Sequence, residues 1–335
     1  MNVSELVKRY GQGERSFRDL NFMGDDLSQI NLAGADLQNM YLGPANLRHA
    51  HFNGANLQNA FLYGANLSYA KLDGCDLTNA DLTKANLQGA SLVRANLAGA
   101  KISGAILKAV NLRGANLERV NLCGANLNGI NLRQANLARA NLNWTNLAGA
   151  RLSGACLTQA TLNGTRLTEA WLNGVDFSGF DLDGVNLSEA HLSGTNFSNT
   201  NLSAANLSQA QLRVANLMRA QLQAANLTEA DLRKADLSEA TLTKADLSQA
   251  NLAIADLTGA NLNLANLTET NLAAASLRGA YLWGAQLVDT DLQDTNFSQA
   301  SLRGAIFTPH CQTGAIFTEA TLPDGSLATG YMKSA

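Results

Sequence analysis

The sequence predicts an all-β solenoid, in which the chain winds in repeated coils around a leucine-filled core. The first observation behind this prediction is a period of five. Every fifth residue from Phe17 to Phe307 is leucine, phenylalanine or isoleucine, which makes (307 − 17)/5 + 1 = 59 successive positions. Five residues turn an α-helix by about 140°, so these side chains would spiral around a helix, and in a flat strand they would alternate between faces. A chain that turns one corner per repeat brings them all to a common axis.

The second observation is the chemistry of the positions between the leucines. Two residues before each leucine the chain is nearly always small, as at Ala55, Ala65 and Cys75, which suits a narrow inward position beside the stacked leucines. The residue directly before the leucine is usually Asn or Asp, and we expect it and the two variable polar residues after the leucine to face outward. Glycine is frequent two residues after the leucine, which predicts a turn there, because glycine adopts positive φ at little cost.

Residues 1–16 precede the repeats and are expected to form an N-terminal cap. The stretch from Ser4 to Tyr10 fits one short amphipathic helix with Ser4 as its N-cap, placed to cover the exposed edge of the first coil. The segment is charged and lacks the apolar core of a secretory signal, and no run in the chain approaches the roughly 18 apolar residues of a membrane span. We therefore expect a cytoplasmic protein.

Residues 17–307 form the repeat domain, and residues 308–335 are expected to form a closing coil and tail. Pro309 and Pro323 cannot donate to a further rung, so they fit the end of the stack. Within the repeats, the inward small position is occupied by larger residues at Ile30, Met40, Ile130 and Phe180. Near Phe180 we expect a local bulge or a widened coil, with irregular core packing as the alternative.

The repeat unit closely resembles the pattern of the pentapeptide-repeat family, A(D/N)LXX. Residues 54–62, which read GANLQNAFL, carry the resemblance, and it extends over about residues 15–307. The resemblance implies a right-handed quadrilateral parallel β-helix with four repeats per coil, so 59 repeats would make about 15 coils. The length and end caps are similar to those of cyanobacterial members.

The sequence contains no constellation of residues that indicates catalysis or a cofactor. Of the cysteines, Cys75 is expected to point inward, Cys123 and Cys156 to project from different faces, and Cys311 to lie in the tail, so they predict neither a disulfide nor a metal site. His49 and His51 are close in sequence but have no third ligand. Without a nucleophile elbow, a phosphate-binding loop or a zincin motif, we expect no enzyme, no metal and no cofactor.

Charge is distributed unevenly along the chain. Residues 84–166 contain ten Lys or Arg and a single acid, Glu118, whereas residues 167–300 contain six basic and fifteen acidic residues. The formal net charge of −3 therefore conceals a basic segment followed by an acidic one.

With four repeats per coil, residues about 20 apart share a face, and one face carries a basic stripe. The candidate partner-binding residues of this stripe are Arg94, Arg113, Arg133, Arg151, Trp171, His191 and Arg213. Stacked arginines with a tryptophan among them suit a polyanion or an acidic protein partner, and the alternative is that these charges only keep the chain soluble. The neighbouring face carries acids at Glu169, Glu189, Glu229, Asp246, Glu269 and Asp289.

Large aromatic residues predict a second contact surface on the opposite face. The candidates are Tyr41, Phe61, Tyr63, Trp144, Tyr281 and Trp283. Exposed aromatics suit contacts with a partner or with a second copy of the chain, and aromatic residues scattered by chance are the alternative.

Three functional hypotheses follow. The first is a non-enzymatic, rod-shaped interaction scaffold whose partner is a protein. The second is direct binding of nucleic acid or an anionic membrane surface through the basic stripe, which salt would weaken steeply. The third comes from the resemblance to gyrase-protecting family members, whose acidic surface imitates DNA toward a topoisomerase. The basic residues from Arg113 to Arg151 argue against mimicry, because a duplex mimic is negative there.

Overall fold

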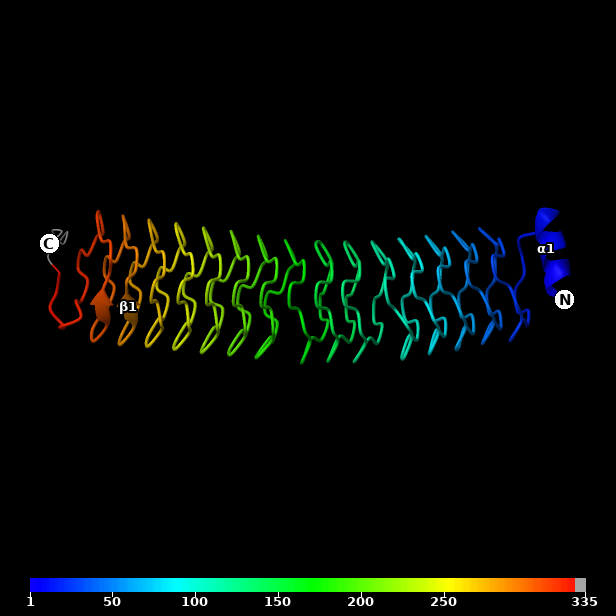
Figure 1. The fold of residues 1–335 in the computed structure, drawn as a ribbon, viewed down its shortest axis with the longest axis horizontal. Helices are drawn as coiled ribbons and strands as arrows, with labels where there is room; N and C mark the ends of the chain where they lie inside the picture. Colours follow the sequence, from blue (N-terminus) through cyan, green and yellow to red (C-terminus); the bar gives the residue numbers. More distant parts are fainter. Residues whose placement is uncertain (329–335) are drawn as a thin grey trace. The chain divides into compact units, whose positions relative to one another are not determined.

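The computed structural model describes residues 1–328 of the chain. It contains one α-helix, α1 (Val3–Gly11), and two short strands, β1 (Gln286–Val288) and β2 (Ile306–Thr308), within those residues. The rest is a regular alternation of single β-bridges and turns. The chain divides into two units, Met1–Thr165 (unit 1) and Arg166–Ala335 (unit 2), and Figure 1 shows stacked coils within each. No helix of the described residues has the length and apolar character needed to cross a membrane.

Residues 20 apart pair side by side in parallel along each unit. In unit 1, for example, Asp36 pairs with Asn56, and in unit 2 Asn206 pairs with Asn226. Each coil therefore consists of four pentapeptides, as the resemblance implied. The total of about 15 coils and the handedness remain predictions for this chain.

The pentapeptides share one plan, from which a few repeats depart. At Asn56 and Leu57, the asparagine makes the β-bridge and the leucine is fully buried, while its amide donates to the carbonyl of Asp76 in the next coil. The next two residues form a turn, closed by the amide of Ala60 donating to the carbonyl of Leu57. The second turn residue, Asn59, has a φ of 55°. Positive φ recurs at this position in almost every repeat, which confirms the predicted place of the turn.

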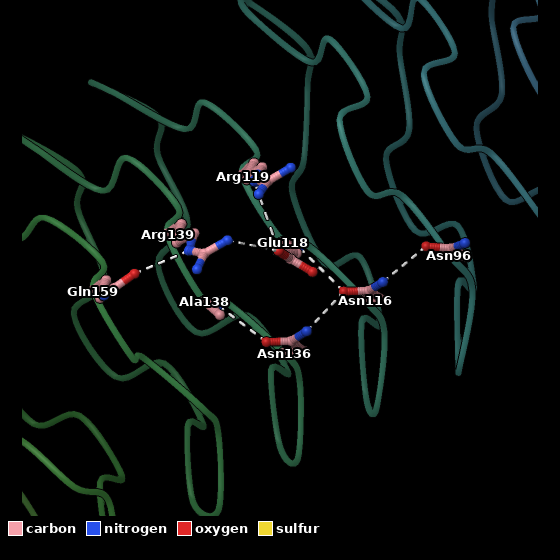
Figure 2. A network of polar contacts seen from close by, with 8 residues as sticks. All are labelled: Asn96, Asn116, Glu118, Arg119, Asn136, Ala138, Arg139 and Gln159. Carbon is pink, nitrogen blue, oxygen red and sulfur yellow. Dashed lines mark hydrogen bonds and ion pairs between the residues drawn. The ribbon is translucent and has the colours of Figure 1, made fainter.

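The Asn and Asp residues before the leucines have two structural tasks. Their side-chain oxygens accept from the backbone N–H two residues later, as Asn136 Oδ1 does from Ala138 N at 3.1 Å. Their amide groups also reach the equivalent residue of the preceding coil: Asn136 Nδ2 donates to Asn116 Oδ1, and Asn116 Nδ2 donates to Asn96 Oδ1. Figure 2 shows this asparagine row. These bonds explain why short amide and carboxylate side chains dominate the position.

Helix α1 lies at the N-terminal end of unit 1, as Figure 1 shows. It buries Leu6, and the Tyr10 hydroxyl donates to the carbonyl of Ala33 in the first coil at 2.8 Å. The N-cap is Asn2, whose Oδ1 accepts from Glu5 N at 2.9 Å. The prediction of Ser4 as N-cap was therefore wrong, because Ser4 already lies inside the helix.

The repeats of unit 2 continue past residue 307. Strands β1 and β2 pair in parallel with Leu287 opposite Phe307, and parallel bridges continue at Cys311, Ile316 and Thr321. An antiparallel bridge between Thr321 and Leu327 ends the stack in the described residues. The predicted closing segment is thus itself a coil, and the part of the predicted tail at 329–335 lies outside the described residues.

Unit 1 contains one interruption between coils, which we call the open rung. All residues concerned are described, yet no backbone hydrogen bond joins residues 101–109 to residues 120–129. The preceding pair of coils is fully bonded here, for example from Leu82 N to Lys101 O and from Ile106 N to Ala85 O. A cavity of about 170 Å³ lies at the open rung, lined by residues 102–105 and 121–126. Within these two ranges, six amides lack the bond that their equivalents make, and they belong to Ile102, Gly104, Leu107, Ala109, Asn121 and Asn126.

We attribute the open rung to a group of branched side chains that flank it. Val120 is the first residue of the open stretch in its coil, and Val110 and Ile130 directly follow the two open stretches. All three are buried at inward positions that alanine usually occupies. Their extra carbon atoms hold neighbouring coils apart in a core as narrow as this one. Ile106 adds to the effect, because it replaces the usual asparagine and cannot accept from the amide of Lys108.

The coil that contains Phe180, where we expected an irregularity, is regularly bonded on one side only. Phe177 N donates to Asn196 O, Gly179 N donates to Ser198 O, and Asn201 N donates to Phe180 O, so the bonding there is regular. Phe180 is half-buried and packs edge-on against Phe177, with ring centroids 5.6 Å apart. The amides of Trp171, Asp176 and Asp181, by contrast, make no backbone hydrogen bond within the described residues, so the bonding of this coil is irregular on its other side.

Candidate interaction surface

The structure places four arginines of the predicted stripe on successive coils of unit 1. Arg94 N donates to Arg113 O, Gly114 N donates to Arg133 O, and Leu132 N donates to Arg151 O. Arg113 and Arg133 are equivalent residues one strand spacing apart, about 4.8 Å, whereas Arg94 is offset from Arg113 by one residue along the chain and Arg151 from Arg133 by two. All four side chains are exposed. We call Arg94, Arg113, Arg133 and Arg151 the arginine column.

The arginine column has no counter-charge within the described part of its unit. None of its four guanidinium groups makes an ion pair or a side-chain hydrogen bond there. Like charges at adjacent positions of neighbouring strands are destabilising. The turn geometry nevertheless accommodates them, since the stem of Arg94 lies over Gly114, where an added Cβ would meet Arg94 Cγ at 3.4 Å.

Other arginines of the basic segment do have partners, and Figure 2 shows them around Glu118. Glu118 Oε1 lies 3.7 Å from both Arg119 Nε and Arg139 Nη1. Arg139 Nε also donates to Gln159 Oε1 at 2.9 Å. The only acid of the basic segment is therefore held on a different column, away from the arginine column.

The remaining stripe residues, Trp171, His191 and Arg213, belong to unit 2 and are described within it. The rings of Trp171 and His191 stack with centroids 3.8 Å apart, and His191 Nδ1 lies 2.9 Å from Gln211 Oε1. Arg213 is exposed and helps to lower the pKa of Asp231, although the hydrogen bond from Arg233 is the largest cause of that shift. The structure thus brings Trp171 and His191 into contact.

Unit 2 carries a column of acids at one turn position. Its five acids were all predicted on the acidic face, and two glutamines lie between them. Asp246, which was also predicted there, is instead a bridge residue that pairs with Asn226. Gln209 Nε2 donates to Glu229 Oε2 at 2.9 Å, and Gln249 Nε2 donates to Glu269 Oε2 at 2.8 Å. None of the carboxylates is in an ion pair within the described residues. We call Glu169, Glu189, Gln209, Glu229, Gln249, Glu269 and Asp289 the glutamate column, and all seven are exposed with positive φ.

In unit 1 the predicted aromatic surface is only partly brought together. Tyr41 and Phe61 lie with ring centroids 6.5 Å apart, Phe61 and Tyr63 stack at 6.1 Å, and Lys84 Nζ lies 5.6 Å from the Tyr63 ring. Trp144 stands apart from them, 71% exposed, and covers Gly164. Three aromatics form a cluster, whereas Trp144 is a separate feature.

In unit 2, an exposed apolar residue that the sequence reasoning missed lies beside Trp283. Leu264 N donates to Trp283 O, and the Leu264 side chain covers Gly284. Two further exposed residues were missed, Val214 and Ile254, which are 61% and 57% exposed. Both are β-branched residues with positive φ, a conformation that is strained for them. The signal available in the sequence was an apolar residue at the turn position, where glycine or a polar residue is usual.

The described residues offer little for catalysis. No group of three or more His, Cys, Asp or Glu side chains within residues 1–328 is arranged to hold a metal ion. Burial raises the pKa of the Cys75 thiol to about 12, so this cysteine is an inert part of the core. The chemistry that the surface offers is charge and aromatic contact.

Comparison with known proteins agrees with the repeat anatomy. The family model described as "Pentapeptide repeats (8 copies)" matches the chain in twelve segments between residues 26 and 308, from 26–62 to 270–308, most of which overlap. No curated protein sequence matches the chain.

Several solved structures are similar to this chain. HetL from the cyanobacterium Nostoc sp. strain PCC 7120, a pentapeptide repeat protein involved in heterocyst differentiation regulation, is 28% identical over 98% of this chain and 100% of its own, with a TM-score of 0.17. Rfr23 from Cyanothece 51142 is 26% identical over 49% of this chain and 98% of its own, with a TM-score of 0.20. A trypsin-treated QnrB1, a plasmid-mediated fluoroquinolone resistance protein, is 19% identical over 53% and 91%, with a TM-score of 0.33.

Proposed function

Because the chain belongs to the pentapeptide-repeat family, we propose that it is a non-enzymatic scaffold that binds a protein partner through the outer faces of its coils. The contact that we propose is between the arginine column of unit 1 and an acidic surface of the partner. Proteins of this family are in general structural or interaction proteins. Membership of the family does not indicate which surface binds the partner, and the unpaired charges of the arginine column indicate one.

The observation that carries the proposal is that four exposed arginines on successive coils lack counter-charges in their unit. Elsewhere the chain satisfies such charges across one coil, as Arg219 Nε does with Glu239 Oε2 at 2.8 Å. Guanidinium groups bind carboxylates in a planar, two-pronged geometry, and arginine is enriched in protein interfaces. An acidic partner would remove the repulsion within the column and form several ion pairs at once.

The test is a binding experiment with a variant that neutralises the column. Arg94, Arg113, Arg133 and Arg151 are all changed to Ser, and this variant and the natural protein are used to capture partners from native lysate at low and high salt. A matched control changes Arg48, Lys84, Lys101 and Lys108 to Ser, which removes the same charge from other columns of unit 1. We expect one defined protein to be captured by the natural protein and the control and lost with the column variant. Equal capture by all three proteins would refute the proposal.

Polyanion binding is a second candidate, favoured by the basic segment as a whole. Residues 82–165 of unit 1 hold nine Lys or Arg against the single Glu118. A nucleic acid or an anionic membrane surface would respond to that total charge, so the column variant and the control would weaken binding equally. Captured material that is removed by nuclease, or binding to vesicles of anionic lipid, would support this candidate over the first. A cytoplasmic location, which we also propose, suits either partner.

A further inference from the structure

We propose that the arginine column of unit 1 and the glutamate column of unit 2 are two halves of one interface, which joins two copies of this chain. This inference rests on the proposed function, because it names the acidic partner of the arginine column. The residues that carry it lie in different units, and each column is argued within its own unit.

Both columns are sets of like charges that their own units leave unpaired. Glu169 and Glu189 occupy successive coils without a cation, just as Arg113 and Arg133 do without an acid, within the described residues. Where unit 2 does hold opposite charges together, their pKa values shift: the hydrogen bond from Arg219 lowers the pKa of Glu239. Uncompensated rows of one sign disfavour the isolated coils, so their counter-charge is expected to come from outside the unit.

The two columns also have complementary spacing. Each advances by one coil for every 18 to 20 residues, and in a parallel stack each coil adds about 4.8 Å. The four successive coils that carry the arginines therefore match four successive coils of the glutamate column, such as those of Glu169, Glu189, Gln209 and Glu229. Gln209 fits this arrangement, because its amide oxygen can accept from a guanidinium group. A second coil stack has this spacing built in, whereas a duplex nucleic acid winds away from a straight row.

The overall charges of the two units support pairing between copies. Unit 1 contains 15 Lys or Arg and 10 Asp or Glu, a net of +5, and unit 2 contains 9 and 17, a net of −8. Unit 1 of one copy is therefore attracted to unit 2 of another at long range, and like units repel. Exposed ion pairs contribute little individually, so we expect a weak association that salt reverses.

The test is charge reversal with rescue. The first variant carries Arg94→Glu, Arg113→Glu and Arg133→Glu, and the second carries Glu189→Arg, Glu229→Arg and Glu269→Arg. A control carries Lys84→Glu, Lys101→Glu and Lys108→Glu, which changes the net charge as the first variant does but on other columns. The molar mass of each 335-residue protein is measured by sedimentation velocity over a concentration series at low and high salt, with circular dichroism to confirm folding.

We expect the natural protein and the control to associate at low salt and to dissociate at high salt. Each column variant alone should raise the dissociation constant by about tenfold or more. An equimolar mixture of the two column variants should associate again, because the reversed columns are complementary. Such rescue could not come from a variant that had merely failed to fold.

A natural protein that stays monomeric at every concentration and salt would overturn the inference, as would a mixture that fails to associate. Binding of a fluorescent poly-glutamate peptide separates this result from failure of the proposed function. Suppose that the natural protein stays monomeric and binds the peptide, while the variant with Arg94→Glu, Arg113→Glu and Arg133→Glu does not. In that case the arginine column still binds an acidic partner, and only the proposal that this partner is a second copy of the chain is refuted. If the natural protein does not bind the peptide either, both proposals fail.

Discussion

The open rung of unit 1 predicts a local weakness that can be repaired by substitution. The perturbation is the triple variant Val110→Ala, Val120→Ala and Ile130→Ala, which restores the usual alanine at the three inward positions beside the gap. With these branched side chains removed, the coils should close and the six unbonded amides should find their carbonyl partners.

The magnitude follows from two opposing contributions. Six restored backbone hydrogen bonds at about 1 kcal/mol each favour the variant by up to about 6 kcal/mol. Each valine loses two buried carbons and the isoleucine loses three, which makes seven. At about 0.8 kcal/mol for each buried carbon, the variant loses roughly 5 to 6 kcal/mol of hydrophobic stabilisation. The free energy of global unfolding should therefore change little, whereas the free energy of local opening at the gap should rise by several kcal/mol.

Hydrogen–deuterium exchange measured by mass spectrometry separates these two quantities. In the natural protein, peptides covering residues 101–109 and 120–129 should exchange much faster than peptides covering residues 82–90, whose amides are bonded to the next coil. In the triple variant the difference should largely disappear, while the urea midpoint stays within a small range. Equal protection of the two regions in the natural protein, or no gain in the variant, would refute the reasoning.

Three further predictions concern single residues. Gly164→Ala and Gly149→Ala should each lower the stability by about 1 kcal/mol, because both glycines have positive φ. Only Gly164→Ala should also change tryptophan fluorescence, because its Cβ would lie 2.3 Å from Trp144 Cε3. Equal fluorescence of the two variants would contradict the contact. Thr200→Val should cost about 1 kcal/mol in urea unfolding, since the buried hydroxyl donates to Phe177 O at 2.7 Å while that carbonyl keeps its bond from Phe180 N. The hydrogen bond from Arg233 lowers the pKa of Asp231, so Asp231→Asn should be less stable than the natural protein above about pH 4, and the difference should vanish as the pH falls through the lowered pKa. Unfolding curves at several pH values check the last prediction, and a difference that persists in acid would contradict it.

Much of the fold could be predicted because each pentapeptide repeats one local solution. The leucine period predicted the core, and the glycines predicted the turn, since both express backbone geometry that acts within five residues. The start of the N-terminal helix was less predictable. The N-cap was expected at Ser4 and lies at Asn2, because a helix boundary depends on which residue reaches the free amides first.

The candidate site, too, was predictable in part from the sequence. The arginine column follows from residue spacing alone once a coil contains four repeats, so the sequence predicted it. That its guanidinium groups lack partners, while Arg139 has Glu118 and Gln159, depends on side-chain positions that no spacing gives. The contacts of Leu264 with Gly284 and of Trp144 with Gly164 likewise join residues from different coils.

The sequence by itself determined the repeat, its inward and outward positions, the turns and the opposite charge of the two halves, because these depend on residue type and a fixed period. Only the tertiary structure decided where the period fails to produce a closed coil. At Phe180, the largest departure in sequence, the bonds toward the next coil are regular, whereas the amides of Asp176 and Asp181 have no backbone acceptor within the described residues. Val110, Val120 and Ile130 are smaller departures, but they lie together in adjacent coils, and packing responds to their combined volume in one place.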